Sequence, residues 1–293
     1  MKFRNILLGL LLTGSFSTSC INEDYSDCHN IYRLALSYLG DENAEIFPDK
    51  IDCVHMYVFD EQNRCVVSEQ LSEAEVQAML VTLPALDPGT YDIVCVGNAY
   101  ETEVENLSSG DFEQIVFSAK DHIAGKTVSG NDPLYWSSIE YQIRPFDVKQ
   151  SVTTETTYFK ASHYDVSVDI IGVPSAADLV VKLVGVSPQT DFNNVAKGTQ
   201  TTYVMDAVHN GDNRMSAVNN IMRHSDQSEV YLVIEASDGR ELARISFAEH
   251  IANHPQIDVD KQECLIPFEV IFKSANVSIS VPSWFIKETN PEF

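Results

Sequence analysis

Basic residues are scarce in this chain of 293 residues, which has 19 Lys and Arg against 43 Asp and Glu and a formal charge of −24. Nucleic-acid binders neutralise phosphates with Lys and Arg, and anionic lipid attracts basic patches, so this balance argues against both ligands. Gly and Pro, at 13 and 11, are too few for a collagen-like or linker-like chain. The length leaves room for about two domains or one large all-β domain, and the 44% of hydrophobic residues is enough to fill a core.

Motifs of known catalytic chemistry are also missing. The sequence has no Cys-x-x-Cys, no Gly-x-Ser-x-Gly turn and no Gly-rich phosphate loop. His250 and His254 have the i, i+4 spacing of helical metal ligands but no intervening Glu, so we interpret them as solvated surface histidines. Residues 206–214 depart from the calcium-loop pattern and are interpreted as a polar loop. We expect no enzyme activity, metal, cofactor or small-molecule substrate.

The first residues of the chain form a targeting signal. Lys2 and Arg4 precede an apolar run, Ile6 to Leu12, and small polar residues then lead to Cys20. Because the apolar run is too short to span a bilayer, residues 1–19 are predicted to be a cleaved secretory signal.

Cys20 is the predicted lipidation site. The preceding Ser17-Thr18-Ser19 is similar to a relaxed bacterial lipobox, although Ser17 stands where a strict lipobox has Leu or Val. Acyl chains on Cys20 would anchor the protein stably to the outer membrane. The alternative is an ordinary cleaved signal with Cys20 in a disulfide. The acidic residues that follow, in a tether over residues 20–30, resemble an export signal to the outer surface of that membrane, or are simply a solvated linker.

The other cysteines do not suggest a disulfide framework. If Cys20 is acylated, five remain, and an odd number cannot all pair within the chain. Cys53 and Cys95 stand in apolar strand-like runs, where a free Cys behaves as a small hydrophobe. We therefore predict free thiols, with a bridge from Cys28 left open. The remaining cysteines are Cys65 and Cys264.

The first half of the chain is mainly predicted to be β-strand. Residues 51–60 form a strand that returns as a hairpin at residues 65–67, and residues 91–97 form a buried strand. Ser72 and Glu75 match a capping box, which predicts one short helix to residue 80.

Between residues 100 and 144 the pattern weakens into loop clusters. The bulky triplet Leu134 to Trp136 interrupts them, and we expect it to fold back onto a core edge. A domain boundary is placed near residues 153–160, in a Thr-rich polar stretch.

The second half of the chain is also mainly predicted to be β-strand, and no internal sequence repeat is detectable. In residues 164–170 apolar and polar side chains alternate, and residues 179–186 are a near-continuous apolar strand. Asp238-Gly239 between two β runs predicts a hairpin with a type I′ turn. Residues 264–273 and 276–281 form a final hairpin.

These elements predict an all-β fold of two tandem antiparallel β-sandwiches with one or two short helices. The N-terminal sandwich is expected over residues 31–157 and the C-terminal sandwich over residues 158–293. The two halves match in character only.

The order of these features resembles the FimB-type fimbrial anchor lipoproteins of Bacteroides-like bacteria. The lipobox is followed by the strand Val54 to Asp60, the turn Leu86 to Tyr91, and a last strand pair closed by Trp284. The resemblance implies two transthyretin-like sandwiches behind a lipidated Cys20, and a role in holding the base of a fimbria (type V pilus). The implied partner is a fimbrial stalk subunit, bound by β-strand contact at the cell outer membrane.

A C-terminal segment, residues 277–286, is the candidate for strand exchange with that partner. Its apolar positions are Val277, Ile279, Val281 and Trp284. The competing interpretation is a plain core strand of the second sandwich.

Two other functions stay open. A surface glycan-binding lipoprotein would use exposed aromatic side chains, for which Trp136 and Trp284 are candidates, although aromatic residues in sandwiches usually belong to the core. A lipid-anchored hydrolase would need two convergent carboxylates, and no pair is singled out by the sequence.

Overall fold

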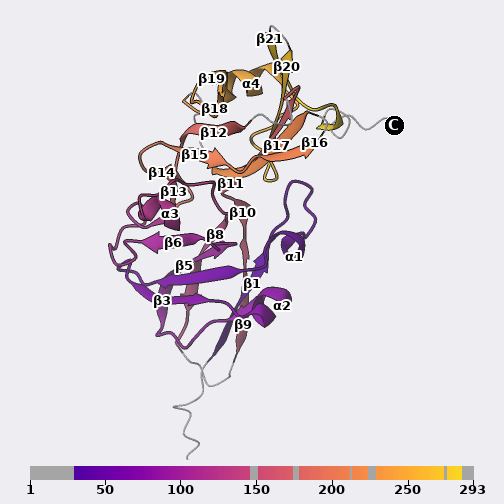
Figure 1. Cartoon of the computed structure of the whole chain (residues 1–293). Helices are drawn as coiled ribbons and strands as arrows, with labels where there is room; N and C mark the ends of the chain where they lie inside the picture. Colours follow the sequence, from indigo (N-terminus) through magenta and orange to yellow (C-terminus); the bar gives the residue numbers. More distant parts are fainter. Residues whose placement is uncertain are drawn as a thin grey trace, which may run out of the picture.

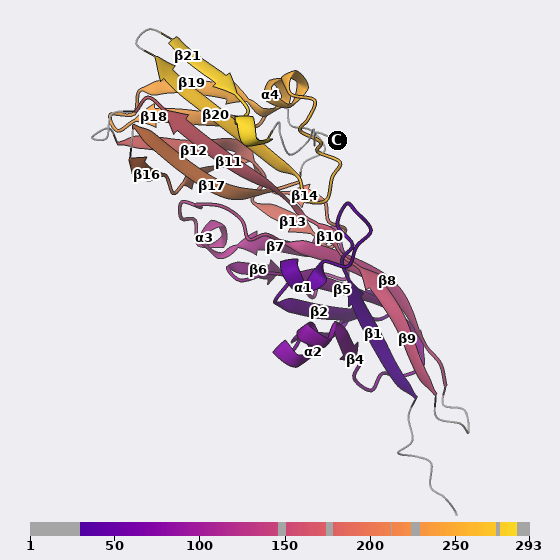
Figure 2. The same cartoon turned by 90° about the vertical axis from the view of Figure 1, so that its right-hand side faces the viewer.

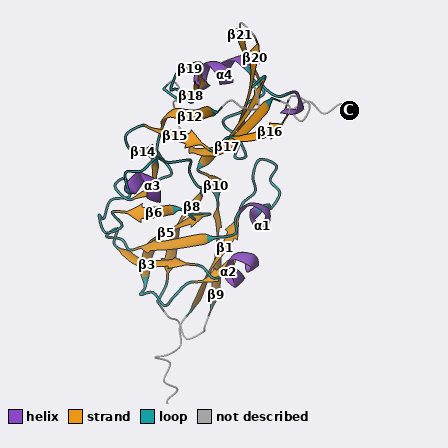
Figure 3. Ribbon diagram, in the orientation of Figure 1, coloured by secondary structure: helices purple, strands orange, loops and turns teal. Residues whose placement is uncertain are grey.

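The computed structural model describes residues 30–145, 151–173, 178–211, 213–223, 229–273 and 276–285. Strands dominate these residues, and the helices are all short (Figure 3). They build two stacked β lobes, the first coloured indigo to magenta and the second orange to yellow (Figure 1). The all-β class predicted from the sequence is confirmed, with four short helices rather than one or two among the described elements.

The first lobe is a sandwich of the sheets β4-β1-β9 and β10-β8-β5-β2-β3. Residues buried between them form one core cluster, which includes Leu34, Met56 and Tyr141. The elements of this lobe are β1 (Ile31–Ser37), α1 (Phe47–Lys50), β2 (Val54–Phe59), β3 (Cys65–Gln70), α2 (Glu73–Ala78), β4 (Leu80–Thr82), β5 (Gly89–Gly97), β6 (Thr102–Glu105), β7 (Val116–Ala119), α3 (Lys120–Ile123), β8 (Tyr135–Ile143), β9 (Val152–Tyr158) and β10 (Lys160–Ala161).

The second lobe is a sandwich of the sheets β16-β17-β11-β20-β21 and β15-β12-β18-β19. Its core cluster includes Val168, Leu232 and Phe268. The elements of this lobe are β11 (His163–Ile171), β12 (Leu179–Val186), β13 (Gln189–Asp191), β14 (Ala196–Lys197), β15 (Thr201–Met205), β16 (Val208–Gly211), β17 (Arg214–Met222), β18 (Tyr231–Ala236), β19 (Glu241–Ser246), α4 (Phe247–Asn253), β20 (Leu265–Lys273) and β21 (Asn276–Ser280).

The two sandwiches share one strand order, which the sequence did not reveal. The strands β1, β2, β3, β4, β5, β8 and β9 correspond in turn to β11, β12, β15, β17, β18, β19 and β20. In both lobes the first strand pairs in parallel with the seventh, and the other corresponding pairs are antiparallel. The expectation that the halves match in character only was therefore wrong, because strand order can repeat without any repeat of residues.

A fifth sheet, β14-β13-β7-β6, joins the two lobes. Its central pair takes β7 from the first half and β13 from the second. Phe117 and Phe192 stack there at 4.6 Å between ring centroids, within a core cluster shared by both halves. The loops predicted for residues 100–144 are thus partly strands, and Tyr135 and Trp136 begin the long strand β8 instead of folding back from a loop.

Local sequence signals were more accurate elsewhere. Strand β12 occupies the predicted residues 179–186, and the Ser72–Glu75 capping box is present at α2. Val166, Val168 and Ile170 of β11 are buried, as their alternation requires. The β18–β19 hairpin is also present, but Gly239 alone has a positive φ and the register shifts near Glu235, so the turn is not type I′.

Candidate subunit interface at the open sheet edges

Strand β21 forms an open edge of the second sandwich. It pairs with β20 in antiparallel register and ends its sheet, so no described strand covers its other side. Such an edge leaves backbone N–H and C=O groups free to pair with a strand from another chain.

The predicted exchange residues lie on this edge or directly after it. Ile279 pairs with the buried Val270 and therefore points to the same, core-facing side of the sheet. Val277 and Ile279 nevertheless remain 38% and 41% exposed. Val281, by contrast, is buried in the core, as is Phe285. The segment is thus an edge strand followed by a buried anchor, and Ile286 lies outside the described residues.

The first sandwich has an open edge of a different kind. Strand β9 pairs with β1 and ends its sheet, because this lobe has no described counterpart of β21. Its side chains are mostly Thr, and Val152 and Tyr158 are exposed at its two ends. Sequence analysis did not identify this edge, because the Thr-rich stretch has little apolar patterning.

The two Trp residues are placed differently. The indole of Trp136 donates its Nε1–H to the Phe192 carbonyl oxygen over 3.0 Å, and its side chain packs on the core shared by both lobes. Trp284 is 42% exposed and lines a groove of the second sandwich. Only Trp284 is therefore open to a ligand.

The histidine pair is not a solvated surface motif. His250, on α4, is 3% exposed, stacks on Phe268 at 4.1 Å, and donates from Nε2 to the Pro267 carbonyl oxygen over 2.9 Å. Burial lowers its pKa to about 4, so the ring is neutral at pH 7. The surface interpretation of His250 was wrong because α4 lies against β20, while His254 bonds the His250 carbonyl oxygen at 2.7 Å.

The remaining candidates from the sequence are the polar loop over residues 206–214 and the cysteines. Residues 206–214 lead into and through the β16–β17 hairpin, apart from residue 212, which is not described. In the described ranges no group of three or more His, Cys, Asp or Glu is arranged to hold a metal. The four cysteines in those ranges are free, whereas Cys20 and Cys28 fall outside them.

A polar clamp that the sequence did not reveal joins the lobes at Glu263. Its carboxylate accepts hydrogen bonds from Tyr38, from Lys50 and, over 3.3 Å, from Tyr135. Burial alone would raise the pKa of Glu263, but the bonds from Lys50 and Tyr38 outweigh it and lower that pKa. Asp41 adds contacts of 2.6 and 3.1 Å to two backbone N–H groups of the same loop. Tyr38 and Lys50 are 225 and 213 residues from Glu263 in the sequence, and Tyr135 is 128 residues from it.

Two β-sandwiches in tandem, with open sheet edges, define the class of this molecule as an all-β protein. None of the helices in the described part is long and apolar enough to cross a bilayer. The model of the fimbrillin-A associated anchor proteins Mfa1 and Mfa2 matches residues 25–290. The chain therefore belongs to this fimbrial anchor family, which is a family of structural proteins rather than enzymes.

Solved structures share the fold at low sequence identity. The fimbrial anchor protein Mfa2 of Porphyromonas gingivalis is 16% identical, with a TM-score of 0.68 over 87% of this chain and 98% of that one. A candidate adhesin of Bacteroides ovatus is 16% identical, with a TM-score of 0.68 over 87% and 94%. A candidate polysaccharide-binding protein of Bacteroides thetaiotaomicron is 13% identical, with a TM-score of 0.69 over 87% and 96%. A search of curated proteins finds no match.

Proposed function

We propose that this chain is a surface lipoprotein that holds the base of a fimbria at the outer membrane. In this proposal Cys20 carries the lipid, and the stalk subunit binds by β-strand addition at β21. Family membership supports the role, and the open, half-apolar edge of β21 is the observation that carries the contact. Backbone hydrogen bonds to an added strand provide affinity, and side chains such as Ile279 provide specificity.

The positions of the two ends support this proposal. Strand β1 starts at the pole of the first sandwich farthest from the second, whereas β21 lies at the opposite pole (Figure 2). A lipid on Cys20, which precedes β1, would hold the first pole near the membrane. The edge at β21 would then face away from the membrane, toward a filament.

Replacing the acylated cysteine tests the anchor directly. We expect Cys20→Ala to leave the fold intact by circular dichroism and to release the protein, with any attached filament, into the medium. Cys28→Ala is the matched control, because it removes a nearby thiol outside the lipobox, and it should stay on the cell. A Cys20→Ala protein that remains fully cell-bound would falsify the anchor proposal.

Glycan binding is the second candidate function, and the half-exposed Trp284 is the observation that favours it. Of the two Trp side chains only Trp284 is available, because the indole of Trp136 is engaged with Phe192. Purification from outer membranes in mild detergent separates the two candidates. A stalk subunit that co-purifies supports the anchor, whereas bound oligosaccharide without a protein partner supports the glycan binder.

A further inference from the structure

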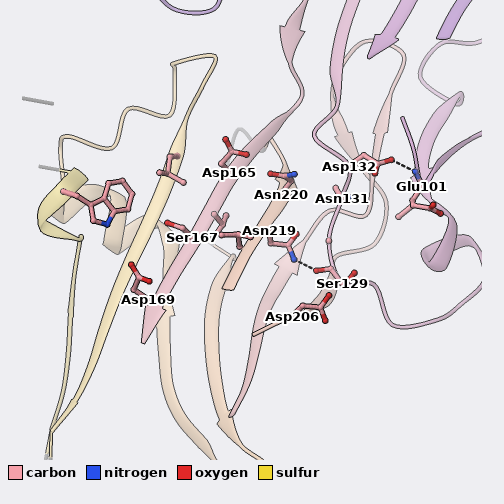
Figure 4. A pocket seen from close by; sticks show the side chains of 16 residues that line it. Glu101, Ser129, Asn131, Asp132, Asp165, Ser167, Asp169, Asp206, Asn219 and Asn220 are labelled. Carbon is pink, nitrogen blue, oxygen red and sulfur yellow. Dashed lines mark hydrogen bonds between the residues drawn. The ribbon is translucent and has the colours of Figure 1, made fainter. Parts of the chain in front are cut away.

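A groove of about 820 Å³ crosses the outer face of the sheet that contains β11, β17 and β20. It lies where the two lobes meet, because Glu101 and the loop Ser129 to Asp132 come from the first half of the chain (Figure 4). Asn219 of β17 donates a hydrogen bond to the Ser129 carbonyl oxygen and holds that loop against the sheet.

The floor of the groove is a row of polar side chains on β11. Asp165, Ser167 and Asp169 lie along this strand in Figure 4. They are on the opposite face of the strand from the buried Val166 and Val168. Alternate side chains on a strand are about 7 Å apart. The floor therefore presents three polar groups in a line, at the spacing of alternate residues in any extended peptide.

The polar atoms of the groove are mainly hydrogen-bond acceptors. No Lys, Arg or His belongs to its described lining, which includes five carboxylates: Glu101, Asp132, Asp165, Asp169 and Asp206. Two of these already have partners, since Glu101 lies 3.4 Å from Lys120 and Asp132 accepts two hydrogen bonds of 2.7 Å.

In the described residues the floor carboxylates make no salt bridge to Lys or Arg, although Lys50 and Arg223 act on Asp165 from a distance. Burial raises the pKa of both Asp165 and Asp169. His163 lies 3.6 Å from Asp165, but burial lowers the pKa of His163 and favours its neutral form. Arg214 faces Asp169 from β17 but is opposed there by Glu269.

Two side chains of the lining hold buried polar atoms that have no hydrogen-bond partner. They are the amide of Asn131, a residue only 9% exposed, whose oxygen and nitrogen are both unpaired, and the hydroxyl of Ser167. Buried polar atoms are normally paired, so these groups favour a polar ligand at the groove.

Apolar side chains complete the lining. Val218 lies on β17 directly across from Ser167 and is 76% exposed on the outer face of the sheet, where polar side chains are usual. Trp284 lines the same groove. The face of an indole ring attracts a guanidinium or ammonium group.

We propose that this groove binds an extended segment of a partner protein that presents Arg or Lys side chains at alternate positions. Guanidinium has five N–H donors and no acceptor, which matches a lining of acceptors. The proposal rests on the proposed function only in taking the occupant to be a protein. A neutral glycan fits less well, because it brings no positive charge to the five carboxylates of the lining.

A charge placed in the groove gives the test. The probe is hexa-arginine with blocked ends, titrated into the purified protein and followed by calorimetry and by Trp emission. We expect one saturable site that is weakened about tenfold by Val218→Lys, because the new cation repels the peptide. Val66→Lys is the matched control, since Val66 is an exposed Val on β3 outside the groove, and it should change affinity less than about twofold.

A second pair of variants covers the floor. Asp165→Asn/Asp169→Asn should weaken the peptide about tenfold, whereas Glu69→Gln/Asp87→Asn changes the net charge equally at exposed sites of the first sandwich and should have little effect. Equal weakening by the groove and control variants would show diffuse attraction to an acidic protein and overturn the proposal.

Two further outcomes would overturn it. One is the absence of saturable peptide binding. The other is a shift of Trp emission by mannohexaose, lost in Trp284→Phe, without a response to the peptide, which would assign the groove to glycans. Because these assays contain no filament and no membrane, failure of the groove leaves the Cys20→Ala test of anchoring unaffected.

Discussion

The first and second sandwiches follow one strand order, but in the second a further strand pairs with the seventh strand of that order. In the first, β9 ends its sheet, whereas in the second β21 lies beyond the equivalent strand β20. The two open edges therefore differ in chemistry: β9 carries mostly Thr, with the exposed Val152 and Tyr158 only at its two ends, whereas β21 exposes Val277 and Ile279 on its core-facing side. An edge with apolar side chains along the strand is the better template for a partner strand. The edge that favours strand addition is therefore that of β21, at the pole of the molecule opposite the start of β1.

The joining sheet and the Glu263 clamp imply that the sandwiches unfold together, and core truncations test this most strongly. Phe268→Ala in the second lobe and Leu34→Ala in the first should each cost about 2–5 kcal/mol, because both side chains are fully buried. Urea unfolding is the measurement, with a single transition expected for both variants. Val66→Ala, at an exposed site, should stay within about 0.5 kcal/mol.

Two separate unfolding transitions would contradict the expectation that the sandwiches unfold together. If Leu34→Ala unfolds the first sandwich while the second keeps its unaltered midpoint, the lobes are independent. The shared sheet would then be a contact without energetic coupling.

The clamp itself should contribute less. Glu263→Gln keeps the shape of the side chain but removes the charge that Lys50 and Tyr38 contact. We expect a loss of about 1–3 kcal/mol in the free energy of unfolding. Glu69→Gln, at an exposed site on β3, is the control. An equal effect of the two changes would mean that the clamp does not hold the lobes together.

Acid should weaken the second sandwich through His250. The folded-state pKa is about 4 and the ordinary value 6.5, so between them the unfolded chain binds the proton more readily. The contribution of the neutral His250 ring to the free energy of unfolding is therefore complete above about pH 6.5. It is lost as the pH falls toward 4, and the loss is at most about 3 kcal/mol. The measurement is the free energy of unfolding against pH.

Two histidine variants isolate this contribution from that of the carboxylates. His250→Gln should flatten the pH dependence, whereas His122→Gln, on α3 in the first half, should not. The same slope in both variants would contradict the assignment to His250.

The accuracy of the sequence analysis followed the range of the interactions. Ser72 and Glu75 are three residues apart and Val166 alternates with its neighbours, so both signals were legible locally. Strand β7 is stabilised by pairing with β13, some 70 residues later, and its segment was therefore predicted as loop. The clamp partners of Glu263 are farther still, and no local pattern marks them.

The candidate interface was predictable only in part. The alternation in residues 276–281 indicated a strand, but whether a strand is central or at an edge depends on what the rest of the chain places beside it. The groove at Asp165 was invisible for the same reason, because its wall comes from the loop at Ser129.

The smallest expected change in stability decides which edge binds the partner. Ile279→Lys on β21 and Thr156→Lys on β9 both place a cation on an open edge strand at an exposed position. Each should alter the free energy of unfolding by less than about 1 kcal/mol. Lys on an edge strand opposes the addition of another strand. We expect Ile279→Lys to stay membrane-bound but to lose the fimbrial subunit on purification in mild detergent, and Thr156→Lys to retain it.

The reverse result has an equally definite meaning. If Thr156→Lys loses the subunit and Ile279→Lys keeps it, the partner strand takes the place beside β9 that β21 occupies beside β20. The shared strand order makes that position geometrically complete, since β1 and β9 repeat the parallel pair of β11 and β20. Anchoring at Cys20 would stand, but the filament would start from the lobe nearest the membrane, and the exposed side chains of β21 would need another explanation.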